Sequence, residues 1–223
     1  MDLLMAMGMI LGAYFLGAVP FAYLLGRWRG VDLTQAGTRN VGATNLAHQA
    51  GWSVAVCALL LDMGKGWLPA WGCKMVGLGE GIAVSAALAA VIGHSWPLYL
   101  RFRGGRGNAT SFGAVLNLAP LALAGACVPF ALGVFSGYTG LGMLTGFVLL
   151  PLLALLTGES PVVAWGLLGL LPIIIARRLT AQGVRAMVAA APDRRRAVVN
   201  LLLHDNVAGT RRGARPPRPA GPS

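Results

Sequence analysis

The chain consists of long apolar runs separated by short polar segments. About 20 consecutive apolar residues in a helix are enough to cross the hydrocarbon core of a membrane. We therefore predict a membrane-spanning helix in each run of that kind. The clearest runs are Leu3–Leu25, Trp52–Trp71, Ile82–Leu100, Leu141–Leu156 and Val162–Ala176. The first run follows Asp2 rather than a basic segment, which favours a span over a cleavable signal peptide.

The apolar stretch from residue 111 to residue 135 decides how many times the chain crosses the membrane. As one helix it gives six crossings and leaves the arginine-rich C-terminal segment outside. Pro120 offers a break, because proline lacks a backbone donor and disfavours helix at the preceding residue. The break predicts a short half-helix over Thr110–Leu118 and a separate pass over Leu121–Phe135. Irregular backbone at membrane depth is tolerated where it lines a cavity or is buried in protein, so we also predict a cavity beside this break.

Composition supports a membrane protein. Of the 223 residues 56% are hydrophobic and 11% are charged, with a mean hydropathy of +0.68, whereas soluble domains carry about 25% charged residues. The predicted fold class is an all-α polytopic integral membrane bundle of about seven passes, including the half-helix. We expect a transmembrane domain over residues 1–178, a cytoplasmic amphipathic segment over 179–209 and a disordered basic tail over 210–223.

The net charge of +11 is concentrated at the C-terminal end, where ten arginines from Arg177 onward face only Asp193 and Asp205. Positive charge marks the cytoplasmic side of a membrane and attracts anionic lipids. We therefore expect a cytoplasmic C-terminus, an outside N-terminus and contact with anionic membrane lipids. No aromatic platform interleaves with the basic residues, so nucleic acid is not an expected partner. The oligomeric state is left open.

The three cysteines give no sign of a disulfide or a metal site, because no CxxC pair is present. Cys57, Cys73 and Cys127 lie within apolar runs and are expected to pack in the core. No cofactor is expected.

The first of three polar clusters is AGTRNVGATNLAHQAG, residues 36–51. Gly37 and Gly42 permit close approach of the backbone. The small polar side chains of this cluster can hydrogen-bond phosphate or hydroxyl oxygens. The cluster is equally compatible with a tight loop between helices whose polar groups satisfy one another.

The second cluster places Asp62 and Lys65 three residues apart, and therefore on one face of a predicted span. Ionisable groups inside a span are costly, and they are usually functional or paired with one another. Either reading fits here, and Asp62 is also a candidate to orient an arginine of the third cluster.

The third cluster is GHSWPLYLRFRGGRGNAT, residues 93–110. Arginine matches phosphate geometry, consecutive glycine amides can form an anion-binding nest, and the start of the half-helix adds unpaired N–H groups. All three devices favour an oxyanion. The topological alternative, positive residues on the inner side and nothing more, explains Arg101 but not the adjacent glycines Gly104 and Gly105. No serine or cysteine nucleophile with a base partner is recognisable.

These segments resemble one known family. GTRNVGATN (37–45), DMGKG (62–66) and GHSWPLYLRFRGGRGNAT (93–110) are similar, in order and spacing, to the motifs of the bacterial acyl-phosphate:glycerol-3-phosphate acyltransferases of the PlsY type. The resemblance implies a seven-pass enzyme of the bacterial inner membrane in phospholipid biosynthesis. Its substrates would be acyl-phosphate and glycerol 3-phosphate, its product lysophosphatidic acid, and no covalent acyl-enzyme would form.

The resemblance also implies roles for particular residues. Four would take part in catalysis: Thr38, Asn45, His94 and Arg106. Twelve would bind substrate: Arg39, Asn40, Gly42, Thr44, His48, Asp62, Lys65, Arg103, Gly104, Gly105, Gly107 and Thr110. Arg103 and Arg106 would hold phosphate, the loop around Thr38 and the Gly104–Gly105 amides would cradle a second oxyanion, and the acyl chain would lie in a groove between spans.

Several positions depart from the family's pattern. Thr38 replaces a serine, Arg39 a glycine and His48 an arginine, while Gly140 and Met143 stand where serines are common. The alternatives are therefore a diverged member that uses another acceptor or only binds lipid phosphate, and a transporter of small phosphorylated anions.

Overall fold

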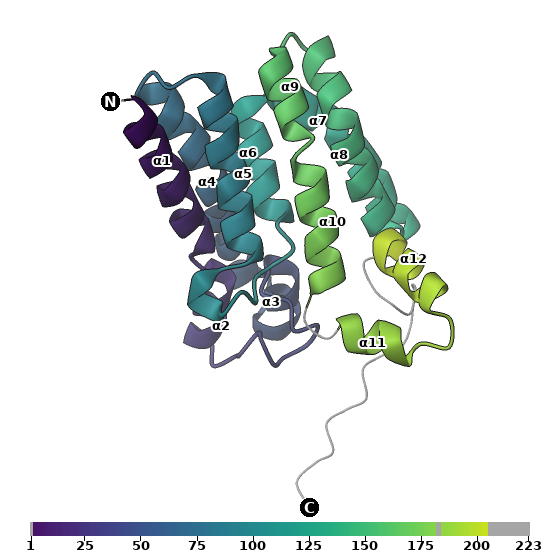
Figure 1. The fold of residues 1–223 in the computed structure, drawn as a ribbon. Helices are drawn as coiled ribbons and strands as arrows, with labels where there is room; N and C mark the ends of the chain where they lie inside the picture. Colours follow the sequence, from purple (N-terminus) through teal and green to yellow (C-terminus); the bar gives the residue numbers. More distant parts are fainter. Residues whose placement is uncertain (1, 182–183, 205–223) are drawn as a thin grey trace, which may run out of the picture.

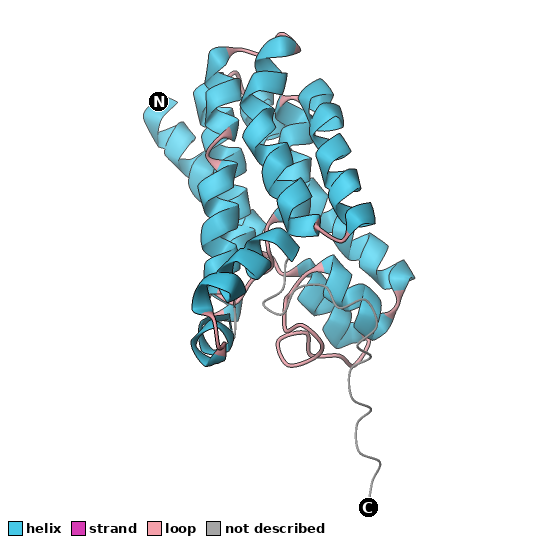
Figure 2. Cartoon of the chain, turned by 90° about the vertical axis from the view of Figure 1, so that its right-hand side faces the viewer, coloured by secondary structure: helices cyan, strands magenta, loops and turns pink. Residues whose placement is uncertain are grey.

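The computed structural model describes residues 2–181 and 184–204, and within these residues every regular element is a helix (Figure 2). The helices are α1 (Asp2–Ala18), α2 (Phe21–Trp28), α3 (Ala43–Ala50), α4 (Trp52–Met75), α5 (Glu80–Ser95), the 3₁₀ turn η1 (Leu98–Leu100), α6 (Asn108–Leu118), α7 (Pro120–Ser136), α8 (Thr139–Leu156), α9 (Pro161–Leu167), α10 (Leu170–Thr180), α11 (Val184–Ala190) and α12 (Arg194–His204).

Five helical segments of the described chain are long and apolar enough to cross a membrane, which confirms the predicted class of fold. They are Leu3–Trp28, Trp52–Met75, Glu80–Leu100, Thr139–Leu156 and Pro161–Thr180. The first and last are interrupted helices: α1 and α2 meet at Val19–Pro20, and α9 and α10 meet at Leu168–Gly169. The apolar pattern predicted one continuous helix for each of these runs, and the two interruptions were not predicted.

The break at Pro120 is confirmed. The half-helix α6 ends at Leu118 and α7 begins at Pro120, so the eleven residues of α6 reach only about half of the ~30 Å hydrocarbon core. Lys74 Nζ donates to the Asn117 carbonyl at 2.8 Å, which supplies a partner at the C-terminal end of α6. Leu118 and Ala119 at the break are buried in the core, and the cavity predicted beside the break stays a prediction.

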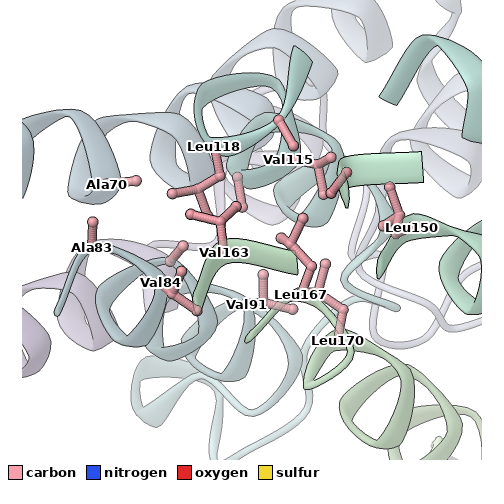
Figure 3. Close-up of a cluster of buried hydrophobic side chains, with 14 of the residues drawn as sticks. Ala70, Ala83, Val84, Val91, Val115, Leu118, Leu150, Val163, Leu167 and Leu170 are labelled. Carbon is pink, nitrogen blue, oxygen red and sulfur yellow. The ribbon is translucent and has the colours of Figure 1, made fainter. Parts of the chain in front are cut away.

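Glycines let the half-helix lie directly against α4. A Cβ added at Gly66 would meet the Thr110 carbonyl oxygen at 1.9 Å, and one added at Gly113 would meet the Met63 carbonyl oxygen at 1.9 Å. In a membrane the tails of the lipids are as apolar as leucine, so close backbone packing of this kind is what joins helices. The main core then fills with small and branched side chains (Figure 3), among them Ala70, Ala83, Val84, Val91, Val115, Leu118, Leu150, Val163, Leu167 and Leu170.

The short helices gather at one end of the bundle. Figure 1 shows α2, α3, α11 and α12 at its lower end, while α1 begins at the upper end. The turn between α7 and α8 belongs to the lower end, since His204 Nδ1 of α12 lies 3.1 Å from the Gly137 carbonyl oxygen. The segment predicted to be amphipathic, residues 179–209, contains the helices α11 and α12. Residues 205–209 of that segment and the predicted tail 210–223 lie outside the described residues.

Candidate active site

A cavity of about 520 Å³ lies where α3 and the loop before it meet α4, α5, α6, α7 and α8. It brings together the first and third polar clusters, which are far apart in the sequence. Of the residues singled out in the sequence, its lining includes Thr38, Asn40, Gly42, Thr44, Asn45, His48, Asp62, His94, Arg106 and Gly107.

Asn45 organises the loop that forms one wall of this cavity. Its side chain is buried, its Nδ2 donates to the Ala36 and Asn40 carbonyl oxygens at 3.0 Å each, and its Oδ1 accepts from the Thr38 amide at 3.1 Å. The self-satisfied loop considered in the sequence analysis is thus present. It lines the cavity as well, so the reading as a substrate-binding loop stays a prediction beside it.

The exposed positions of this loop differ in their relation to the cavity. Thr38, Thr44 and His48 are exposed and line it. Arg39 is exposed but is not part of the lining, and its φ of 57° lies in the left-handed region that favours glycine. Its role in binding stays a prediction.

Asp62 and Lys65 form a buried ion pair, with 2.7 Å between Lys65 Nζ and Asp62 Oδ1. Lys65 Nζ also donates to the Val19 carbonyl oxygen at 2.7 Å, at the interruption between α1 and α2. The neighbour of Asp62 across the helices is His94, whose Nδ1 lies 3.6 Å from Asp62 Oδ1. Asp62 is therefore placed to orient a histidine, and not the arginine for which the sequence made it a candidate. No group of three or more His, Cys, Asp or Glu side chains that could hold a metal occurs in the described residues.

The double glycine is held by protein groups. The Gly105 amide donates to the His94 carbonyl oxygen at 3.2 Å, so it is not available to the anion-binding nest suggested by the sequence. The carbonyl oxygens of Gly105 and Gly104 accept from Arg177 Nε at 2.8 Å and Arg177 Nη2 at 2.6 Å. Sequence reasoning missed Arg177, which it counted only as part of the basic C-terminal segment.

The remaining predicted residues occupy different surroundings. Arg106 is partly exposed and lines the cavity, whereas Arg103 is exposed and does not, so its phosphate contact stays a prediction. Thr110 is fully buried at the contact of α6 with α4. Lys65, Gly104 and Gly105 line a separate small cavity of about 10 Å³, which His94 and Asp62 also border.

Part of the lining of the large cavity is apolar, and these residues were not predicted individually. Its side chains come from α4, α6, α7 and α8: Leu59, Met63, Phe112, Phe130 and Met143. The rings of Phe112 and Phe130 pack edge to face with 5.5 Å between their centroids. Asn108, at the start of α6, adds a polar side chain to the lining. The lining is therefore amphipathic, since it combines cationic and hydroxyl groups with aliphatic and aromatic groups.

Comparison with known proteins points to one family. A family model described as glycerol-3-phosphate acyltransferase matches residues 7–187. A relative from Dehalococcoides mccartyi, named glycerol-3-phosphate acyltransferase 5, is 36% identical over 188 residues, covering 78% of this chain and 77% of the relative. The crystal structure of PlsY, described as an integral membrane glycerol 3-phosphate acyltransferase in its glycerol 3-phosphate form, superposes with a TM-score of 0.71 at 28% identity, covering 82% of this chain and 92% of PlsY. The lysophosphatidic acid form of PlsY gives a TM-score of 0.70 at 27% identity, with the same coverage.

Proposed function

Because this chain belongs to the glycerol-3-phosphate acyltransferase family, we propose that it transfers a fatty acyl group from acyl-phosphate to the 1-hydroxyl of glycerol 3-phosphate. The products are lysophosphatidic acid and inorganic phosphate. PlsY, the solved relative, is described in forms with glycerol 3-phosphate and with lysophosphatidic acid, which supports this acceptor and this product.

The observation that carries the proposal is the amphipathic lining of the 520 Å³ cavity. Arg106 and His48 supply cationic or ionisable groups on the side where phosphates would bind, and guanidinium matches phosphate geometry. Phe112, Phe130 and Met143 supply apolar lining, against which an acyl chain would gain about 0.8 kcal/mol for each buried CH₂ group. One cavity thus suits both a phosphate group and an aliphatic chain.

The reaction needs no nucleophile from the protein. Acyl-phosphate is a mixed anhydride, so its acyl carbon is already activated. The 1-hydroxyl oxygen attacks this carbon, a new ester C–O bond forms, and the C–O bond to phosphate breaks. The leaving phosphate carries away the electron pair and takes the hydroxyl proton. The contribution of the protein is to position the two substrates and to neutralise their charge, and both are large terms in catalysis.

His94 is assigned the task of orienting the acceptor hydroxyl. Its ring borders the cavity, and Asp62 lies 3.6 Å from its Nδ1. A carboxylate beside Nδ1 favours the tautomer with the proton on Nδ1 and holds the ring in one orientation. Nε2 is then left to the substrate. Lys65 in turn fixes Asp62 through the buried ion pair. The three side chains therefore act as one unit that keeps the imidazole ring in place.

An assay with purified protein in lipid tests the proposal. With acyl-phosphate and glycerol 3-phosphate present, phosphate release and lysophosphatidic acid formation should rise together. The Arg106→Ala variant should lose turnover while keeping the thermal stability of the parent, since Arg106 is partly exposed and its loss leaves no core cavity. Near-normal turnover in Arg106→Ala would contradict the charge-neutralisation mechanism, and no turnover by folded parent protein would contradict the function.

A different acceptor is the second candidate, and two positions favour it. His48 and Met143 both line the cavity, at places where the family's motifs have an arginine and a serine. A methionine removes a hydroxyl that an acceptor could use, and an imidazole in place of a guanidinium removes the fork that can hold phosphate through two hydrogen bonds. Phosphate release without lysophosphatidic acid would support this candidate, and a Met143→Ser variant would then be expected to raise transfer to glycerol 3-phosphate.

We also propose that the end of the bundle carrying α3, α11 and α12 faces the cytoplasm of a bacterial cell, with α1 beginning outside. Arg194, Arg195 and Arg196 are exposed on α12 at that end and would face anionic headgroups of the inner leaflet. A reporter fused after Arg178 should therefore be found inside the cell, and a reporter in the turn at Gly158 outside. The opposite result would invert the orientation and remove the role of anionic lipid.

A further inference from the structure

A buried arginine outside the predicted site holds the backbone that leads into it. Arg177 is 4% exposed and lies near the end of α10. Its Nε and Nη2 donate to the carbonyl oxygens of Gly105 and Gly104, at 2.8 Å and 2.6 Å, and its Nη1 lies 3.5 Å from the Thr180 carbonyl oxygen. In the part of the chain that the structure describes, no carboxylate pairs with Arg177. Its two short hydrogen bonds go to one peptide segment, and the rigid guanidinium fork fixes both the place and the orientation of that segment.

The other side of the same segment is in contact with His94. The Gly105 amide donates to the His94 carbonyl oxygen at 3.2 Å, and a Cβ at Gly105 would lie 2.2 Å from His94 Nε2. Gly105 is thus held between Arg177 and the imidazole ring. Arg106 follows directly in the chain and lines the cavity. Any shift of the Gly104–Gly105 backbone therefore moves a predicted phosphate ligand and the surface against which His94 packs.

We infer that Arg177 is a positioning residue for acyl transfer, acting through the Gly104–Gly105 backbone on Arg106 and His94. The inference rests on the proposed function. Without the guanidinium the two carbonyl oxygens lose their donors inside a buried region, and the backbone shifts toward another partner. A misplacement of about 1 Å at reacting groups can lower a rate by about 10²-fold.

The test compares Arg177→Gln with Arg178→Gln in lipid or detergent. Arg178 is the matched control, since it is 1% exposed and also donates to backbone carbonyls, those of Gly140 and Leu202 at 3.3 Å and 3.0 Å. Both variants should lower Tm. Arg177→Gln should lower kcat/KM by about 10²-fold, and Arg178→Gln should lower it far less. Arg177→Lys, which has one donor group in place of the guanidinium fork, should have a kcat/KM between those of the parent and Arg177→Gln.

A double-mutant cycle separates positioning from general destabilisation. If Arg177 acts through the segment that carries Arg106, the double variant should lose less kcat/KM than the product of the fold-losses of Arg177→Gln and Arg106→Gln, because the effects of coupled sites are not additive. Losses that multiply, or equal kinetic losses in Arg177→Gln and Arg178→Gln, would overturn the inference.

A readout without turnover distinguishes failure of this inference from failure of the proposed function. Glycerol 3-phosphate should raise the Tm of the parent and of Arg178→Gln, but raise that of Arg177→Gln less, because at a given concentration a ligand that binds more weakly stabilises the folded state less. If the parent shows neither turnover nor this stabilisation, the proposed function itself is wrong, and the inference is wrong with it. If the parent shows both and Arg177→Gln matches it, only the role of Arg177 is refuted.

Discussion

Replacing Gly105 with alanine tests whether the double glycine matters through space rather than through flexibility. The φ of Gly105 is not in the left-handed region, so alanine can adopt this backbone without strain. The difficulty is the new methyl group, which would lie 2.2 Å from His94 Nε2, 2.8 Å from His94 Cε1 and 2.8 Å from the Val41 carbonyl oxygen. Carbon and nitrogen do not approach so closely without a bond, and either the ring or the backbone must shift by about 1 Å.

Two magnitudes follow from this overlap. Adding a methyl group to a packed site costs about 1–3 kcal/mol of stability, which lowers the Tm of a chain of this size by roughly 2–4 °C for each kcal/mol. The effect on catalysis should be larger, since a shift of about 1 Å at a reacting group can cost about 10²-fold in rate. We therefore expect Gly105→Ala to remain folded and to lose about 10²-fold in kcat/KM for phosphate release.

Gly64→Ala is the matched control. Gly64 lies inside α4, and a Cβ added there would meet no atom within 4 Å. Alanine in a helix interior is favoured over glycine by about 0.5–1 kcal/mol, so this variant should keep the parent kinetics and its Tm should rise slightly. Kinetics of Gly105→Ala within threefold of the parent would refute the close contact between Gly105 and His94, and with it the assignment of that ring to the site.

Two further variants test the buried pair and the strained loop residue. Asp62→Asn should lower the free energy of unfolding by about 3–5 kcal/mol, because it leaves Lys65 charged and unpaired in the protein interior. The double variant Asp62→Asn with Lys65→Met should recover most of this stability, measured by thermal unfolding, but not the activity. Recovery of both stability and activity would show that Asp62 does not orient His94. Arg39→Gly should raise the unfolding free energy by about 1 kcal/mol. Arg39 has a φ of 57°, and this left-handed backbone conformation costs non-glycine residues about 1–2 kcal/mol. An unchanged or lower Tm would contradict this account.

Proline rules explain both the success and the failure of the predicted helix boundaries. The break at Pro120 was predictable because a continuous helix would have left the basic C-terminal segment outside the cell. A break at the proline adds one pass and places that segment inside. Pro20 interrupts the first span in the same way, but the number of passes does not depend on it and no conflict pointed to it. The interruption matters for the site, because the Val19 carbonyl oxygen beside it accepts a hydrogen bond from Lys65 Nζ.

The polar half of the site was more predictable than the apolar half. Thr38, His94 and Arg106 belong to compact motifs whose residue types are unusual beside apolar runs, and they meet in one cavity. Phe112 and Phe130 gave no such signal, because lipid and the interior of a membrane protein are equally apolar, and a side chain facing a cavity looks like one facing lipid. Arg177 could not have been placed either, since its partner Gly105 is 72 residues away and a basic residue after a span already has a topological explanation.

The hydrogen bonds of the site are consistent with catalysis by positioning. Asn45 directs its amide group to the backbone of its own loop, Asp62 directs its carboxylate to Lys65 and His94, and Arg177 directs its guanidinium to the double glycine. Groups already bonded to the protein cannot contribute much to substrate affinity, but they fix the places of those that face the substrate. Such preorganisation lowers the barrier without reorganisation during the reaction. It follows that substitution of Asn45 or Asp62 should reduce kcat more than it raises KM. Substitution of Arg106, which lines the cavity, or of Arg177, whose loss displaces Arg106, should affect both.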